Sequence, residues 1–122
     1  ADEKDHILKP VAWAGKEEGY LTSIPPISVD DIPSGRGPAG RAFREGKSYV
    51  AKDFASNPNL NLWRNEGVKR GYASSIGIPI KIKNKSIGTF SIYSSEVDFF
   101  NEIFVFKYNL NIPYFLSSNI KY

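Results

Sequence analysis

The sequence contains no cysteine and only one histidine, His6. Without cysteine, the chain can form no disulfide, no thiolate metal site, no thiol nucleophile and no thioether bond to a chromophore. A single histidine cannot build a cluster of imidazole metal ligands, and it argues against a histidine-dependent catalytic triad. We therefore expect the domain itself to be non-catalytic and to hold no metal.

The sequence also lacks long apolar segments and a strong charge of either sign. No apolar run approaches the roughly 20 residues that a membrane-spanning helix needs, and no signal peptide is visible. We therefore expect a cytoplasmic domain with no membrane partner. Sixteen basic and thirteen acidic residues give a net charge of +3. This excess is spread along the chain, so it is weak evidence for a nucleic-acid partner.

The length of 122 residues fits a single domain, residues 1–122. An apolar content of 41% and an aromatic content of 14% argue against disorder. The chain begins at Ala1 and contains no methionine, which leads us to expect a piece of a larger protein.

A glycine-rich stretch, residues 35–46, predicts a short helix. Pro38 suits the first position of the helix, and Gly37 suits unusual backbone angles in the residue that precedes it. Gly46 suits a left-handed cap at the end of the helix. A strand over residues 48–52 follows. A second helix is predicted from Leu62 to Arg70, where Gly67 in the middle indicates close packing against another element.

The clearest β signal is an isoleucine-rich hairpin. Residues 74–82 place Ile76, Ile78, Ile80 and Ile82 on one face at period two, and residues 87–93 return antiparallel after a turn at Asn84. Two further strands are predicted, over residues 7–14, near a sheet edge because of Pro10, and over residues 27–29.

The C-terminal residues 103–122 predict an atypical exit helix. Phe99, Ile103, Phe106 and Leu110 fall on one helical stripe, which is either core or half of a dimer seam. Pro113 predicts a kink or a stop in that helix.

Several short motifs occur in a fixed order: Leu8–Gly15, Gly35–Ala42, Val50–Asp53, Asn57-Pro58, Trp63-Arg64, Gly71-Tyr72, Ser74-Ser75, Ile78–Ile80, Ile87-Gly88 and Asp98–Phe100. With these motifs, residues 7–102 resemble a GAF domain of the kind found in bacterial sensor histidine kinases, diguanylate cyclases and phosphodiesterases. The resemblance implies an α+β, PAS-like fold with a central antiparallel sheet of five to six strands and helices on both faces. Members of the family usually open with an N-terminal helix and a first strand, and we expect both to be missing from this chain.

The resemblance also implies a function. We expect a regulatory domain that binds a small molecule, forms a homodimer through terminal helices and signals to an attached output domain. The residues expected to line the pocket are Trp13, Arg36, Arg41, Trp63, Arg64, Tyr72, Ser75 and Tyr93. Plain core packing is the alternative for the aromatic residues. Solvent exposure is the alternative for Arg36 and Arg41, which together with the first N–H groups of the Pro38 helix could hold a negative group.

The sequence bears on the ligand class as well. The missing cysteine excludes bilin attachment through a thioether, and His6 lies in a polar surface segment, which argues against haem. Asn84-Lys85 imitates part of a cyclic-nucleotide signature but lies in a hairpin turn. We expect no cofactor. A dimerisation module without a ligand and a weakly basic nucleic-acid-binding module remain alternatives.

Overall fold

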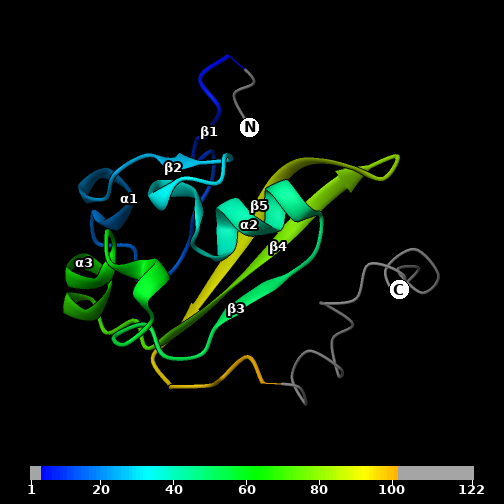
Figure 1. Cartoon of the computed structure of the whole chain (residues 1–122). Coiled ribbons are helices and arrows are strands. Elements are labelled where there is room, and N and C mark those ends of the chain that lie inside the picture. The colour runs from blue at the N-terminus through cyan, green and yellow to red at the C-terminus, as the bar shows by residue number, and fades with distance from the viewer. Residues whose placement is uncertain (1–3, 102–122) are drawn as a thin grey trace.

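The computed structural model describes residues 4–101. Its helices and strands follow in the order β1 (Ile7–Leu8), α1 (Tyr20–Ser23), β2 (Ile27–Ser28), α2 (Pro38–Glu45), β3 (Tyr49–Ala51), α3 (Arg64–Lys69), β4 (Ser74–Ile82) and β5 (Lys85–Ser94). Two short 3₁₀ turns, η1 (Pro33–Gly35) and η2 (Pro58–Leu60), precede α2 and α3. Figure 1 shows α2 lying across the long β4–β5 hairpin, with α1 and α3 together at one side.

The main sheet is antiparallel and has the order β3-β4-β5. Its hairpin confirms the predicted pattern: Ile76 pairs with Ile92 and Ile78 pairs with Phe90. Lys83 and Asn84 form the turn with φ of 49° and 66°, the left-handed pair that a tight hairpin requires. The register shifts between Ile80, which pairs with Gly88, and Lys81, which pairs with Ser86, so Ile87 forms a β-bulge.

The remaining strands form a separate sheet. β1 and β2 pair only with each other, so the strands lie in sheets of three and two rather than in one sheet of five to six. The strand predicted over residues 7–14 ends at Leu8, because Pro10 has no N–H to donate to a partner. The α+β character is confirmed.

Alternate residues of the main sheet point to opposite faces. Ala51, Ser75 and Tyr93 share the face that the helices cover, where the core contains Tyr20, Phe54, Leu60 and Trp63. On the outer face, buried Ile76 packs with Phe100, and Val50, Ile78 and Ile92 surround them. In the described part of the chain, helices therefore cover one face. The terminal exit helix predicted for the other face lies outside the described residues.

Glycines allow the helices to lie close to their neighbours. A Cβ at Gly77 of β4 would lie 2.6 Å from the Pro38 carbonyl carbon, so α2 rests directly on the sheet. A Cβ at Gly67 would lie 2.2 Å from Cε1 of Phe54, which confirms the predicted close packing of α3. Gly46 ends α2 with φ of 69°, as predicted.

Candidate ligand-binding site

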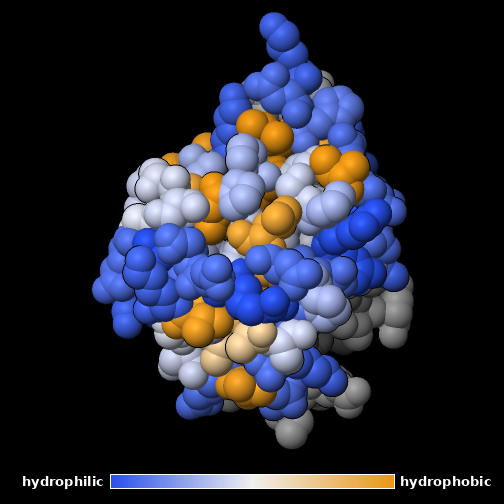
Figure 2. Space-filling model, turned by 60° about the vertical axis from the view of Figure 1, so that its left-hand side comes forward, coloured by the Kyte–Doolittle hydropathy of each residue, from blue (hydrophilic) through white to orange (hydrophobic). Residues whose placement is uncertain are grey.

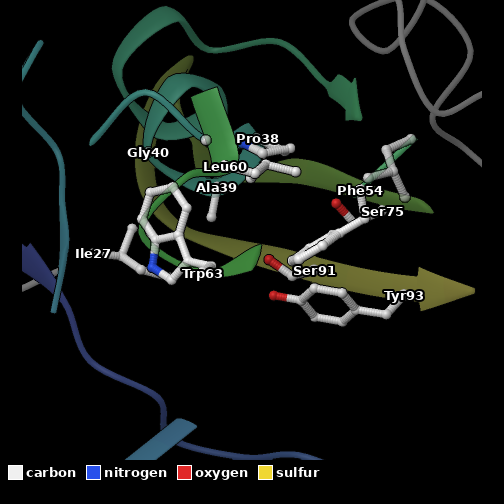
Figure 3. Close-up of a pocket in the computed structure, with 12 residues that line it drawn as sticks. Ile27, Pro38, Ala39, Gly40, Phe54, Leu60, Trp63, Ser75, Ser91 and Tyr93 are labelled. Atoms are coloured by element: carbon white, nitrogen blue, oxygen red, sulfur yellow. The ribbon is translucent and has the colours of Figure 1, made fainter. Parts of the chain in front are cut away.

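A small pocket lies between the start of α2, the η2–α3 segment and the helix-covered face of the sheet. Its volume is about 30 Å³, which is room for a group of few atoms. Figure 3 shows the lining: Ile27, Pro38, Ala39, Gly40, Phe54, Leu60, Trp63, Ser75, Ser91 and Tyr93, together with Gly37 and Ile76. The pocket therefore joins residues from β2, the start of α2, the segment 54–63, β4 and β5.

Gly37 gives the pocket its shape through a close approach. A Cβ at this position would lie 3.0 Å from Cζ3 of Trp63 and 3.3 Å from Cδ2 of Leu60. The backbone angles of Gly37, φ −75° and ψ 175°, are open to any residue. The prediction that this glycine serves unusual backbone angles is therefore wrong, and the indole of Trp63 is what requires it.

The pocket is rich in hydrogen-bond donors. The indole Nε1 of buried Trp63 has no hydrogen-bond partner among the residues described. No side chain caps the N-terminus of α2, whose first residues Pro38, Ala39 and Gly40 line the pocket. Ser75, Ser91 and Tyr93 add hydroxyl groups (Figure 3). Burial raises the pKa of Tyr93 to about 12.

A larger groove of about 830 Å³ adjoins the pocket. Its walls are the segment from Leu8 to Glu17 on one side and β5 residues 89–94 on the other. The groove and the pocket share four lining residues, Ile27, Ala39, Ser91 and Tyr93. Figure 2 shows apolar patches between hydrophilic side chains on the side of the molecule that carries α1 and α3. A single ligand with a small end and a wider body could therefore occupy both cavities.

An aromatic cluster forms the boundary of the groove. The rings of Tyr72 and Tyr93 are stacked with centroids 4.6 Å apart, and Tyr20 contacts both edge-on at 5.0 and 5.6 Å. Burial raises the pKa of Tyr20 above its usual range. This cluster gives the groove a rigid apolar wall.

The structure brings five of the eight predicted site residues to these cavities. Trp63, Ser75 and Tyr93 line the pocket, and Trp13, Tyr72 and Tyr93 line the groove.

The other three residues predicted to line the pocket, all arginines, line neither cavity. Arg36 Nε lies 2.9 Å from Asp31 Oδ1, and this hydrogen bond lowers the pKa of the Asp31 carboxyl. Arg41 Nε lies 3.4 Å from Glu45 Oε2, and its guanidinium stands 4.0 Å from the centre of the Tyr49 ring. Arg64 donates from Nη2 to the carbonyl of Asn57 at 2.7 Å.

Two other arginines fix the loops around the site, and the sequence analysis did not identify them. Arg70 is buried, donates to the carbonyl oxygens of Glu17, Glu18 and Glu66, and pairs with the Glu66 carboxylate at 3.1 Å. Arg44 donates to the carbonyls of Val29, Asp30 and Gly35 at 2.9–3.2 Å. Arg44 lies in the last turn of α2 and Arg70 directly follows α3, positions where a basic side chain is usually exposed to solvent, so the sequence could not reveal these contacts.

The comparison with protein families decides the identity of the fold. Residues 1–105 match the family model described as "GAF domain". The chain belongs to the GAF domain family. GAF domains are in general regulatory modules that bind ligands.

A solved structure is also similar to this GAF domain. It is the free methionine-R-sulfoxide reductase from Neisseria meningitidis in complex with its substrate, with 27% sequence identity and a TM-score of 0.46. The match covers 58% of this chain and 40% of that protein, so the chain spans two fifths of its length. No curated protein matches the sequence.

The described residues offer no candidate for a membrane span or for a metal site. Among residues 4–101, no helix is long and apolar enough to cross a membrane. The same residues contain no group of three or more His, Cys, Asp or Glu side chains placed to hold a metal ion.

Proposed function

We propose that this GAF domain is a non-catalytic sensor that binds a small molecule in the pocket and adjoining groove. It would signal to an attached output domain in a bacterial signal-transduction protein. The observation that carries the proposal is the indole of Trp63, whose buried N–H has no partner, in the wall of a cavity that continues into a groove. A buried donor without an acceptor destabilises a fold by about 1–3 kcal/mol, and a ligand that accepts its hydrogen bond removes that cost.

The sheet offers a route from the pocket to the opposite face. Ser75 of β4 lines the pocket, and the next residue, Ile76, packs on Phe100 behind the sheet. A ligand that shifts β4 would therefore change the packing of Phe100, from which the chain continues toward residue 102. The ligand can change the output only by the difference between its affinities for the two conformations.

The chemistry of the lining supports binding rather than reaction. The chain has no cysteine nucleophile, and the pocket is lined by apolar side chains, hydroxyl groups and one indole. Burial raises the pKa of Tyr93 to about 12, which makes its phenol a weaker acid than an exposed tyrosine. The proposal therefore assigns these groups to recognition.

A thermal-shift screen with a metabolite library tests the proposal. A ligand at 100 times its dissociation constant adds about 2.7 kcal/mol of stability, which raises the melting temperature of a domain of this size by roughly 10 °C or more. Stabilisation that disappears when Ala39 in the lining is replaced by a larger residue would support the pocket. A library with no stabilising member would count against it.

A dimerisation module is the second candidate function. The outer face exposes Ile80, Ile82 and Phe90, with 45%, 58% and 57% of their surface accessible. Sedimentation equilibrium would favour this function if the chain dimerises, a Phe90→Ser variant stays monomeric, and no compound raises the melting temperature. Dimerisation through the terminal helices, a cytoplasmic location and a regulatory partner domain remain predictions.

A further inference from the structure

Three cavity features together define the kind of group that the pocket can hold. The first is the Trp63 indole Nε1, which is buried and unpaired in the described structure. Figure 3 shows this nitrogen on the edge of the ring near Ile27, a residue that lines both cavities. An N–H in this position calls for an acceptor atom from a ligand.

The second feature is the N-terminus of α2. This helix of eight residues starts after Gly37, which has no side chain to cap it. The first N–H groups of a helix lack partners within the helix and carry its positive end. Because Pro38, Ala39 and Gly40 line the pocket, this positive end adjoins the same space as the Trp63 N–H.

The third feature is the charge of the lining. None of the pocket's lining residues is charged, and Arg36 and Arg41 are paired with carboxylates elsewhere. A phosphate with two charges would have no cation opposite it. A carboxylate carries one charge and two acceptor oxygens, which suits one indole N–H, a helix N-terminus and neighbouring hydroxyls.

The groove determines which chemical group the rest of the ligand can carry. Its walls include Trp13, Leu21 and Tyr72, and it joins the pocket along Ala39 and Tyr93. Because the pocket has room for only a few atoms, the bulk of a ligand has to lie in the groove against these apolar side chains.

We infer that the ligand is an aryl carboxylic acid, with its carboxylate in the pocket and its ring in the groove. This inference rests on the proposed function and deepens it. Trp63 donates from Nε1 to one carboxylate oxygen, and the start of α2 stabilises the negative charge.

Isothermal titration of the full 122-residue chain with phenylacetate and with neutral phenylacetamide tests the inference. We expect phenylacetate to bind at least about tenfold tighter, because hydrogen bonds to a charged acceptor are the stronger ones. Trp63→Phe, which keeps an aromatic ring and removes the N–H, should weaken phenylacetate about tenfold and phenylacetamide less. In the unliganded variant, the loss of an unpaired buried donor should offset part of the cost of the cavity that the smaller ring leaves.

A second variant keeps the test decisive if Trp63→Phe fails to fold. Ala39→Asp adds a negative charge at the start of α2, which suits the helix but repels a bound carboxylate. Because any larger side chain at Ala39 also narrows the pocket, the neutral Ala39→Asn variant of equal size is its matched control. We expect Ala39→Asp to weaken phenylacetate more than Ala39→Asn does, and the two variants to bind phenylacetamide equally. Tyr49→Phe, outside both cavities, is the control and should leave both affinities unchanged.

The outcomes separate this inference from the proposed function. Equal affinity for the two probes, undiminished phenylacetate binding by the Trp63→Phe and Ala39→Asp variants, or binding of non-acidic compounds alone would overturn the inference and leave the sensor function standing. If no compound of the series or of the metabolite library binds, both fail.

Discussion

The indole of Trp63 lies directly against Gly37, so that a Cβ added to the glycine would approach Cζ3 to 3.0 Å. Trp63 is 3% exposed and cannot move outward without leaving the core. This contact fixes the distance between α3 and the start of α2, and with it the width of the pocket.

Replacing Gly37 with valine should therefore destabilise the fold by about 1–3 kcal/mol, the usual range for overpacking. Chemical denaturation measures the change. Gly88→Ala is the matched control, because the nearest atom to its added Cβ is Ile80 Cδ1 at 4.0 Å. Equal stability of the Gly37→Val variant and the control would contradict the role of this contact.

Gly67→Ala should be harmful although alanine is the better helix former. The gain in helix propensity is about 1 kcal/mol, but the new methyl group would lie 2.2 Å from the Phe54 ring, which is itself 1% exposed. We expect a net loss of about 1–3 kcal/mol in the free energy of unfolding. The double variant Gly67→Ala/Phe54→Leu tests the contact, because a shorter side chain at Phe54 should change the loss that Gly67→Ala causes. If the two substitutions have strictly additive effects on the free energy of unfolding, the new methyl group does not contact Phe54.

Arg70 and Arg64 should differ in their importance for stability. Arg70→Ala removes a donor from the carbonyls of Glu17, Glu18 and Glu66, of which that of Glu17 keeps a further donor, the Tyr20 N–H. It also leaves the Glu66 carboxylate without its ion pair, so we expect a loss of about 3 kcal/mol. Arg64→Ala removes the hydrogen bond to Asn57 and should cost about 1 kcal/mol. Because Arg64 lines neither cavity, its removal should leave ligand affinity unchanged. Thermal melts and titrations of both variants measure these effects, and a larger loss from Arg64→Ala would contradict the assignment.

Acid should weaken the start of α1 through Glu17. Hydrogen bonds from the backbone N–H groups of Leu21 and Gly19 lower the pKa of this carboxyl below its ordinary value of 4.5. A folded-state pKa below the unfolded one gives stability that is present above pH 4.5 and is lost as the pH falls through the folded value. Melting temperatures measured from pH 7 down to pH 3 should therefore fall less steeply below pH 4.5 for Glu17→Gln than for the wild type. Parallel curves for the two proteins would rule this contribution out.

The parts of the fold that local chemistry determines could be predicted from sequence. The β4–β5 hairpin follows from isoleucine at period two and from Asn84 in the turn, and α2 follows from Pro38 and Gly46. The family resemblance, confirmed by the match over residues 1–105, supplied the α+β architecture.

Features that depend on distant contacts could not be predicted. Helix α1 has only four residues and is held by the Glu17 carboxylate and by Arg70, which comes 53 positions later. The pocket lining also depends on distant contacts. Trp63, Ser75 and Tyr93 were predicted to line it, but Gly37 was not, because its place there follows from its contact with Trp63. Ser91 faces the same pocket because it pairs with Gly77 in the β4–β5 register.

The indole region of a ¹H–¹⁵N correlation spectrum reports on the Trp63 N–H itself. The chain has two tryptophans, so this region contains two signals, one from buried Trp63 and one from Trp13, which is 62% exposed. When a stabilising ligand is added, we expect a saturable shift of the Trp63 signal to lower field, because its N–H gains an acceptor. A ligand that stabilises the domain while the Trp63 signal stays unchanged would show that the Trp63 N–H does not bind it.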